Sequence, residues 1–530
     1  MKKIILVLCL CFILISCNKA KTPEESINSD EPIDEVTPTV SEEKTEYEEI
    51  YVPTNTTLSF SDNNMDKVIT EPTFDINNYT NDAGSDIKPY QLFSNGMCLQ
   101  RDAINRIWGK ASQTKNIAIE FKGKVYYGSV NGREWEVYLP KMNAGGPYEL
   151  TIISEKGRFK LTDVYIGEVF LCSGQSNMEF RAQDAGNVLK DLYSTSNCIN
   201  DNIRMLNLPS YPQEEATSEL INTLKWESAN QKTIPGFSAV GYLFGKQMQE
   251  ELGCPVGLIS AAVGGTSIEF WLSQENVNKL PYQPFIDQSN EYNKLVMTPS
   301  LGYNGMLYPL IGLNVRGVVW YQGESNALGT QNHYDKALNI YIEQCREMFN
   351  NKQLAFTICE LARYEGNTYT YSVVNEKINE VAETDPYIVV ARNLDLGEWK
   401  DIHPKDKREL ARRASYETLR VFYKKDYVAP INLKSYTFND DGTVTIILTA
   451  DAVLKNGSNG FEVYVNNKFT YDCNVTIEGN KVTVSASGEI IKVRYGYTCE
   501  MTEEIKADVS KMVTVYDNNG FPLDLFIISK

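Results

Sequence analysis

Ser176 is the residue of this sequence whose setting is most typical of a nucleophile. It lies in the segment Cys172–Met178, which follows the apolar run Val164–Leu171. Such a run predicts a buried strand, and the small and polar residues after it predict a tight turn. A turn of this kind can lift a serine clear of a sheet, so that its hydroxyl can attack a carbonyl group. The turn differs from the Gly-x-Ser-x-Gly nucleophile elbow, because Met178 stands where that elbow has its last glycine.

A serine nucleophile needs a base, and the sequence contains only two histidines. His403 lies in the segment Asp401–Pro404, just before a predicted helix, and Asp401 is placed to orient its imidazole. The alternative is that Asp401 caps the helix and His403 is a surface residue. His333 lies at the start of another predicted helix, where we expect it to cap the helix or to contact substrate. Of the two histidines, His403 is therefore the better candidate for the base, with Asp401 as the candidate acid, and the capping alternative stays open.

An acyl-transfer site also needs N–H groups that stabilise an oxyanion. Gly264 and Gly265 follow a predicted strand, and glycine lets a backbone N–H approach a ligand closely. Gln322 follows another strand and offers a side-chain amide. Each segment alone is also compatible with an ordinary turn between a strand and a helix. The Gly264–Gly265 segment and the Gln322 side chain are thus the two candidates for oxyanion donors.

The elements that must position these residues alternate between strands and helices from about residue 164 to 425. Apolar runs predict strands at Val164–Leu171, Val256–Ala261, Val315–Trp320, Leu354–Glu360 and Tyr387–Ala391. Helical periodicity predicts helices at Phe237–Leu252, His333–Phe349 and Lys405–Tyr423. This alternation is typical of an α/β fold with a parallel sheet covered by helices on both faces. In such sheets the chemistry lies beyond the carboxyl ends of the strands, near which the candidate residues fall.

Other patterns flank this region and divide the chain. Short alternating runs between glycine and asparagine turns predict a β-sandwich-like module at 86–163 and a second β module at 429–530. The predicted catalytic domain between them is 164–428. Residues 18–85 are rich in Glu, Ser, Thr and Pro and poor in large apolar side chains, at least up to about residue 60. We therefore expect 18–85 to be a disordered acidic tether.

Residues 1–17 have the features of an export signal. Lys2 and Lys3 precede an apolar run from residue 4 to residue 15, and Leu14–Cys17 resembles the lipobox of bacterial lipoproteins. The run is too short to span a bilayer comfortably. We expect Cys17 to carry lipid and to anchor the protein in the cell envelope, at the outer membrane or cell surface. The alternative is an ordinary cleaved signal with an incidental cysteine.

Composition excludes some partners. The formal net charge is −18, and no stripe of lysine and arginine offsets it, so nucleic acid is not an expected partner. The cysteines after residue 17 form no Cys-x-x-Cys pair and show no metal-ligand spacing. We expect neither a metal nor an organic cofactor.

Several of these segments together resemble the sialate O-acetylesterase family of the SGNH hydrolase superfamily. The matching stretches are Gly167–Glu179, Gly257–Ile259, Gly264–Thr266, Gly317–Ala327 and Asp401–Pro404, with Gly96–Arg101, Ala144–Tyr148 and Asn519–Pro522 in the β modules. The resemblance covers roughly residues 90 to 530. It implies an SGNH-hydrolase-like sheet, with Ser176 as nucleophile and His403 as base. It also implies that the oxyanion donors are the backbone N–H of Ser176, a backbone N–H at Gly264 or Gly265, and the Gln322 side chain. Many SGNH enzymes place the acid three residues before the histidine. Asp401 lies two before it, so the acid role falls to Asp401, to another group or to none.

The resemblance implies a serine esterase that removes O-acetyl groups from carbohydrate, with sialic acid as the expected substrate. A rival within the same chemistry is an acetylesterase acting on xylan, on another plant polysaccharide such as rhamnogalacturonan, or on peptidoglycan. Sialate would call for a cation to meet its carboxylate, and Arg181, Arg363 and Arg392 lie near strand ends. A rival of a different class is a non-catalytic surface lipoprotein that binds glycans through its β modules.

Overall fold

The computed structural model describes residues 57–530, except 83–85, 113, 221–223, 366–367, 456–458 and 499–501. The predicted signal, the lipidation site Cys17 and most of the predicted tether lie outside these residues. The tether prediction is wrong for residues 57–82. The ring of Phe60 is buried beneath the Arg316 guanidinium, 4.6 Å away, and the Ile69 carbonyl accepts a 2.8 Å hydrogen bond from Tyr127 N.

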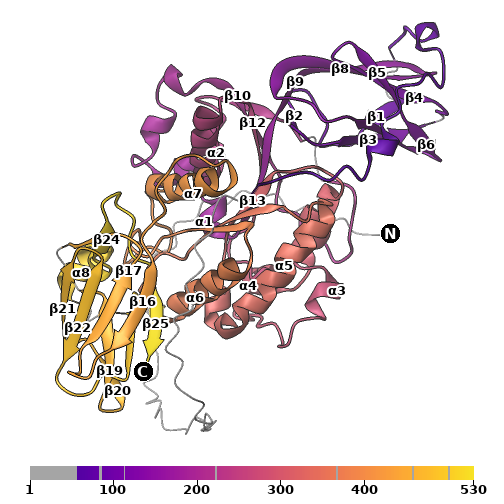
Figure 1. The fold of residues 1–530 in the computed structure, drawn as a ribbon. Coiled ribbons are helices and arrows are strands. Elements are labelled where there is room, and N and C mark those ends of the chain that lie inside the picture. Colours follow the sequence, from indigo (N-terminus) through magenta and orange to yellow (C-terminus); the bar gives the residue numbers. More distant parts are fainter. Residues whose placement is uncertain are drawn as a thin grey trace. The chain divides into compact units, whose positions relative to one another are not determined.

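The centre of the fold is a mainly parallel sheet (Figure 1). Its strands follow in the order β11 (Glu227–Ala229), β10 (Asn200–Asn207), β12 (Val256–Ala262), β9 (Gly157–Gly174), β13 (Gly317–Tyr321), β14 (Ala355–Cys359) and β15 (Ile388–Ala391). All neighbours from β10 to β15 pair in parallel, and only β11 is antiparallel. The strand predictions for this region are confirmed, because strands buried on both faces appear in the sequence as continuous apolar runs. The sequence analysis did not find β10 or β11.

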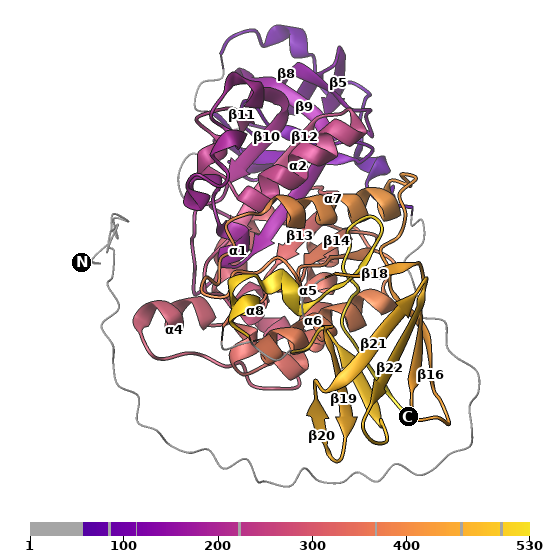
Figure 2. The same cartoon turned by 90° about the vertical axis from the view of Figure 1, so that its left-hand side faces the viewer.

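Helices cover both faces of this sheet. In Figures 1 and 2, α2 (Ala239–Leu252) and α7 (Arg408–Phe422) lie side by side on one face, whereas α5 (Tyr334–Met348) and α6 (Thr368–Thr384) lie on the other. The α/β prediction is thus confirmed. The Ser238 side chain caps α2 by accepting a hydrogen bond from Gly241 N, and Gly253 ends it with φ +61°. Within the described residues, we find no helix with the length and apolar character needed to cross a membrane.

Strand β9 takes part both in the parallel sheet and in the sheet formed by the earlier part of the chain. Its first half pairs with β8 (Gly145–Ser154) and β2 (Cys98–Gln100), and its second half with β12 and β13. The remaining strands of this region are β4 (Ile117–Phe121) and β5 (Lys124–Tyr127), which extend from β8, and a separate antiparallel sheet of β1 (Ile87–Pro89), β3 (Asn105–Ala111), β7 (Glu134–Leu139) and β6 (Ser129–Asn131). The predicted boundary between residues 163 and 164 therefore falls inside one continuous strand.

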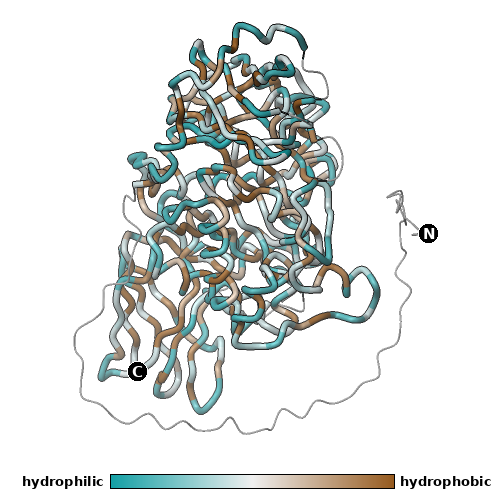
Figure 3. Tube along the Cα trace, turned by 90° about the vertical axis from the view of Figure 1, so that its right-hand side faces the viewer, coloured by the Kyte–Doolittle hydropathy of each residue, from teal (hydrophilic) through white to brown (hydrophobic). Residues whose placement is uncertain are grey.

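A buried carboxylate marks the point where β9 passes between its two sets of partners. Glu168 is fully buried and lies 2.6 Å from Arg101 Nε and 2.7 Å from Arg316 Nε. Gln100 donates to the same carboxylate at 2.8 Å. Burial opposes ionisation of Glu168, but the two guanidinium groups outweigh it and lower the pKa of this carboxyl. The early strands and the parallel sheet also share one hydrophobic core, much of which is brown in the tube of Figure 3.

The last part of the chain is antiparallel and has a hydrophobic core of its own. One sheet contains β16 (Leu433–Phe438), β17 (Val444–Leu448), β22 (Lys481–Ala486) and β21 (Cys473–Glu478), and another contains β20 (Lys468–Thr470), β19 (Phe461–Val465), β23 (Lys492–Tyr495) and β25 (Phe526–Ser529). A third pairs β18 (Ala452–Leu454) with β24 (Val515–Asp517). Alternation of buried and exposed residues along β17 and β22 is typical of sheets with one face in the core.

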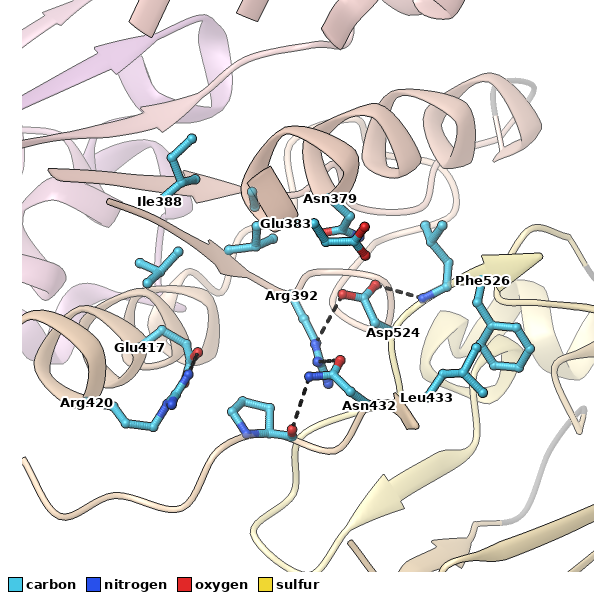
Figure 4. Close-up of a pocket in the computed structure, with 15 residues that line it drawn as sticks. Asn379, Glu383, Ile388, Arg392, Glu417, Arg420, Asn432, Leu433, Asp524 and Phe526 are labelled. Carbon is cyan, nitrogen blue, oxygen red and sulfur yellow. Dashed lines mark hydrogen bonds and ion pairs between the residues drawn. The ribbon is translucent and has the colours of Figure 1, made fainter. Parts of the chain in front are cut away.

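A cavity lined by both polar and apolar residues lies between this last part and the parallel sheet (Figure 4). Arg392, directly after β15, donates hydrogen bonds of 2.6 Å to the carbonyl oxygens of Ile431 and Pro522. Its Nε also lies 3.3 Å from a carboxylate oxygen of Asp524. Arg392 therefore ties the end of β15 to the C-terminal strands. The cavity is lined by none of the predicted catalytic residues.

Candidate active site

The turn that carries Ser176 is fixed by its neighbours. Strand β9 ends at Gly174, whose φ is +144°, and a Cβ there would lie 2.1 Å from the Tyr321 carbonyl oxygen. Only glycine allows β9 and β13 to approach so closely. Gln175 is buried, and its Oε1 accepts hydrogen bonds from Gly323 N and Ser325 N at 3.2 and 3.3 Å. The partly exposed Ser176 then begins the short helix α1 (Ser176–Glu179) at the carboxyl end of β9.

The segment that carries His403 lies against this turn. The His403 ring stacks on the Phe180 ring, with centroids 6.1 Å apart and planes 23° apart. Asn177 Nδ2 donates a 3.0 Å hydrogen bond to the Ile402 carbonyl oxygen. Burial lowers the pKa of His403, the Lys407 ammonium lowers it further, and Asp401 acts in the opposite direction. A neutral imidazole can accept a proton, so the protonation state expected near neutral pH fits the predicted base.

The two histidine rings contact different partners. The His333 ring stacks on Tyr282, with centroids 5.1 Å apart, at the start of α5. Its ring contact is thus with Tyr282 rather than with the Ser176 turn, as expected for a residue outside the catalytic pair. The roles of Ser176 and His403 stay predictions, now with a geometry that brings their two segments together.

Asp401 makes a different contact from the one expected of a triad acid. Its Oδ1 accepts a 2.9 Å hydrogen bond from the backbone N of His403. The same oxygen lies 3.9 Å from the ring Nδ1 of His403, which is too long for a hydrogen bond. Asp401 therefore shapes the turn and acts on the imidazole through its charge. Its assignment as the acid stays a prediction.

The glycine turn lies beside the nucleophile, but one of its amides is occupied. A Cβ on Gly264 would lie 3.3 Å from Ser176 Cβ, so the two segments are adjacent. Gly264 N donates a 2.7 Å hydrogen bond to Glu179 Oε2, and Tyr292 OH donates to the Gly264 carbonyl at 2.9 Å. Burial raises the pKa of Glu179. The sequence analysis found neither Glu179 nor Tyr292, and the choice between Gly264 and Gly265 as oxyanion donor stays open.

Gln322 does not fit its predicted role as an oxyanion donor. Its side chain is fully buried. Its Nε2 donates to the Thr266 carbonyl at 3.0 Å, to Asn326 Oδ1 at 2.7 Å and to Gln175 Oε1 at 3.1 Å. An amide nitrogen has two protons, and three acceptors already compete for them. Gln322 instead holds the loops after β12 and β13 together beneath the nucleophile turn.

A buried polar cluster lies beneath the site and was not expected from the sequence. Asn177 Nδ2 donates to Glu324 Oε1 at 2.6 Å, and Asn177 Oδ1 accepts from Lys407 Nζ at 2.6 Å. All three side chains are almost completely buried. Glu324 and Asn177 belong to the segments quoted above for the family resemblance, but no spacing in the sequence indicates that they meet Lys407.

Comparison with known proteins agrees with this site. Residues 166–414 match the family described as carbohydrate esterase, sialic acid-specific acetylesterase. This match confirms the family resemblance. It spans the Ser176 turn, the Gly264 and Gln322 loops and the His403 segment.

Individual proteins named as sialate O-acetylesterases match between about half and two thirds of the chain. Human sialate O-acetylesterase is 30% identical over 294 residues, which are 51% of this chain and 54% of the human protein. The mouse sialate O-acetylesterase is 26% identical over 404 residues, which are 64% of this chain and 74% of that protein. The chain thus spans about half the length of the human relative. A carbohydrate acetylesterase from Xanthomonas citri superposes with a TM-score of 0.73 at 26% identity, over 84% of this chain and 100% of that one.

Proposed function

We propose that this chain is a serine esterase that removes O-acetyl groups from carbohydrate, with O-acetylated sialic acid as the substrate class. The observation that carries the proposal is the joining of the Ser176 turn to the His403 segment through Asn177 and Phe180. It occurs at the carboxyl end of a parallel sheet, inside the region that matches the esterase family. An SGNH-hydrolase-like arrangement of the sheet is part of this proposal.

In the proposed reaction, Ser176 Oγ attacks the acetyl carbonyl while His403 takes the hydroxyl proton. The tetrahedral oxyanion is stabilised by the backbone N–H of Ser176 and by an N–H of the Gly264–Gly265 turn. The imidazolium then gives its proton to the departing sugar oxygen, which leaves an acetyl-serine. Water, activated by the same imidazole, releases acetate and restores the serine.

Arg181 supports sialic acid over a neutral sugar. Its side chain is 49% exposed, it follows the nucleophile by five positions, and it pairs with Asp184 at 3.0 Å. A guanidinium has five N–H donors, so a pair with Asp184 leaves donors for a substrate carboxylate. Arg363 and Arg392 are buried and donate to main-chain oxygens of Tyr497 and Ile431, in the C-terminal part of the chain. Arg181 is thus the best placed of the three predicted arginines.

The test is acetate release by the purified chain. An aryl acetate reports the esterase chemistry, and O-acetylated sialic acid, acetylated xylan and acetylated peptidoglycan report the substrate. We expect the highest kcat/KM with sialic acid, and Arg181→Gln should raise KM for that substrate but not for the aryl acetate. No acetate from any substrate would favour a non-catalytic glycan-binding protein. A preference for xylan or peptidoglycan that Arg181→Gln leaves unchanged would reject sialic acid.

We propose as well that lipid on Cys17 anchors the protein in the cell envelope, at the outer membrane or cell surface. The support is the sequence pattern alone: an apolar run that ends at Cys17, followed by a long stretch rich in Glu, Ser, Thr and Pro. Cys17→Ser should abolish labelling by a fatty-acid probe and leave the hydrolysis of an aryl acetate unchanged. Wild-type protein that takes up no label would make the segment an ordinary cleaved signal.

A further inference from the structure

Lys407 is almost completely buried, which is unfavourable for a charged side chain. Its side chain is 1% exposed, and it lies just before α7, four positions after His403. Its Nζ is 5.1 Å from the centre of the Phe180 ring and 5.5 Å from that of Tyr321. Lysine is almost never fully buried unless it is paired, because its charge loses hydration. Burial accordingly lowers the pKa of Lys407 to about 8.

The neighbouring groups explain how the buried ammonium of Lys407 is stabilised. Among the described residues, the one hydrogen bond of its ammonium group goes to Asn177 Oδ1 at 2.6 Å. Asn177 in turn donates to Glu324 Oε1, and the other oxygen of that carboxylate is buried with no hydrogen-bond partner among the described residues. Burial raises the pKa of Glu324, while its charge favours the ammonium form of Lys407. Asn177 thus separates a buried cation from a buried anion.

The same asparagine joins the two halves of the site. Asn177 directly follows Ser176, and its Nδ2 also donates to the carbonyl oxygen next to His403. The Phe180 ring contacts the His403 ring on one hand and the Lys407 ammonium on the other. The remaining charges that act on the His403 imidazole are those of Asp401 and Asp184, and both favour its protonation. Lys407 is the charge that opposes them.

We propose that Lys407 is a positioning residue of the esterase. Through Asn177 it fixes the nucleophile turn against the His403 segment, and its ammonium keeps the imidazole in the neutral form that accepts a proton. Lys407 stays cationic over the range in which His403 titrates, because its pKa of about 8 lies above the usual imidazole value. The catalytic consequence rests on the proposed function, whereas the charge coupling between Lys407 and His403 does not.

The coupling can be measured without any substrate. The chain has two histidines, so an NMR titration of the imidazole Cε1–H signals resolves both, and His403→Gln assigns them. In Lys407→Met the pKa of His403 should rise by roughly half a unit or more. Lys405→Met is the matched control: this lysine lies 3.9 Å from Asp401 Oδ2, but its side chain is 48% exposed, so solvent screens it. Equal shifts in the two variants, or none in Lys407→Met, would overturn the proposal.

Two further variants test whether a change in the pKa of His403 comes from loss of the Lys407 charge rather than from unfolding or altered packing. Lys407→Met with Glu324→Gln removes the cation and the anion together, and should show the same rise for His403. Lys407→Arg keeps a positive charge and should leave the pKa of His403 within roughly 0.2 unit of wild type. A rise as large in Lys407→Arg as in Lys407→Met would refute the role of the charge.

The catalytic part is read from the pH dependence of kcat/KM for an aryl acetate. In Lys407→Met the acid limb should move to higher pH together with the titration of His403, so the loss of activity is greatest below about pH 6.5. If the acid limb of the kcat/KM profile stays at the wild-type pH while the NMR titration of His403 shifts, Lys407 does not act on catalysis through His403. An inactive wild-type protein would reject the proposed function, and the NMR result would still decide whether Lys407 and His403 are coupled.

Discussion

Replacing Gln322 by alanine distinguishes a support of the site from an oxyanion donor. The Thr266 carbonyl would lose its donor, whereas Asn326 Oδ1 keeps Ile268 N at 2.9 Å and Gln175 Oε1 keeps Gly323 N at 3.2 Å. One buried acceptor without a partner costs about 1–3 kcal/mol. The cavity left by the missing side chain adds about 2 kcal/mol. We therefore expect Gln322→Ala to lower the free energy of unfolding by about 3–5 kcal/mol.

The assay combines denaturant unfolding with steady-state kinetics on an aryl acetate. At a temperature where the variant is folded, kcat should fall by less than about tenfold, because no donor to the oxyanion is lost. Gln344→Ala is a matched control. Gln344 is also buried, and it makes three hydrogen bonds, to Ser273, Asn276 and Trp271, from α5. It should lose similar stability and keep the wild-type kcat.

The opposite pattern would refute this reasoning. Removal of a true oxyanion donor costs about 10²–10³ in kcat, or about 2.7–4 kcal/mol in the activation barrier. If Gln322→Ala keeps its unfolding free energy within about 1 kcal/mol of wild type and loses kcat by that factor, Gln322 contacts the oxyanion after all.

The remaining predictions concern the reacting groups. Ser176→Ala should reduce kcat by about 10⁶, with an unfolding free energy within about 1 kcal/mol of wild type; a variant within tenfold of wild type would exclude Ser176 as the nucleophile. His403→Ala should be nearly as inactive and His333→Ala nearly as active as wild type, and the reverse order would move the base to His333. Because the pKa of His403 is lowered, kcat/KM of the wild type should decline only as the pH falls below about 6.5, where the imidazole becomes protonated. Asp401→Asn should cost kcat/KM no more than about tenfold, since its carboxylate is not hydrogen-bonded to the ring; a loss near 10⁴ would identify a triad acid.

The central sheet was predictable because its strands are buried on both faces. Val256–Ala261 and Leu354–Glu360 are continuous apolar runs, and they agree with β12 and β14 to within one residue at each end. Helix α2 was predictable from its periodicity, to within two residues at its start. Strand β10 was missed because Asn200–Asn207 mixes apolar and polar residues, as an outer strand of the parallel set does.

The site was predictable in its residue types but not in its contacts. A serine after a strand and a histidine before a helix indicate what each group can do, and the turns at parallel strand ends indicate that they meet. The role of Gln322 could not be predicted from its residue type, because an amide can donate to an oxyanion as well as to buried carbonyl oxygens. The contact of Lys407 with Asn177 could not be predicted either. The two residues lie 230 positions apart in the chain, and the sequence around each of them does not indicate that they meet.

Strand β9 places a constraint on how the chain acquires its structure during synthesis. Its first half finds β8 and β2 in residues made earlier, so that half can pair as soon as it emerges. Its second half, which leads to Ser176, pairs only with β12 and β13, and both lie later in the chain. Until they are made, a largely apolar half-strand with two unpaired edges extends from the paired first half, and other chains can join such edges. The early strands thus hold the strand that leads to the nucleophile, and we expect the growing chain to be most exposed to aggregation between the synthesis of residue 174 and that of β12 and β13.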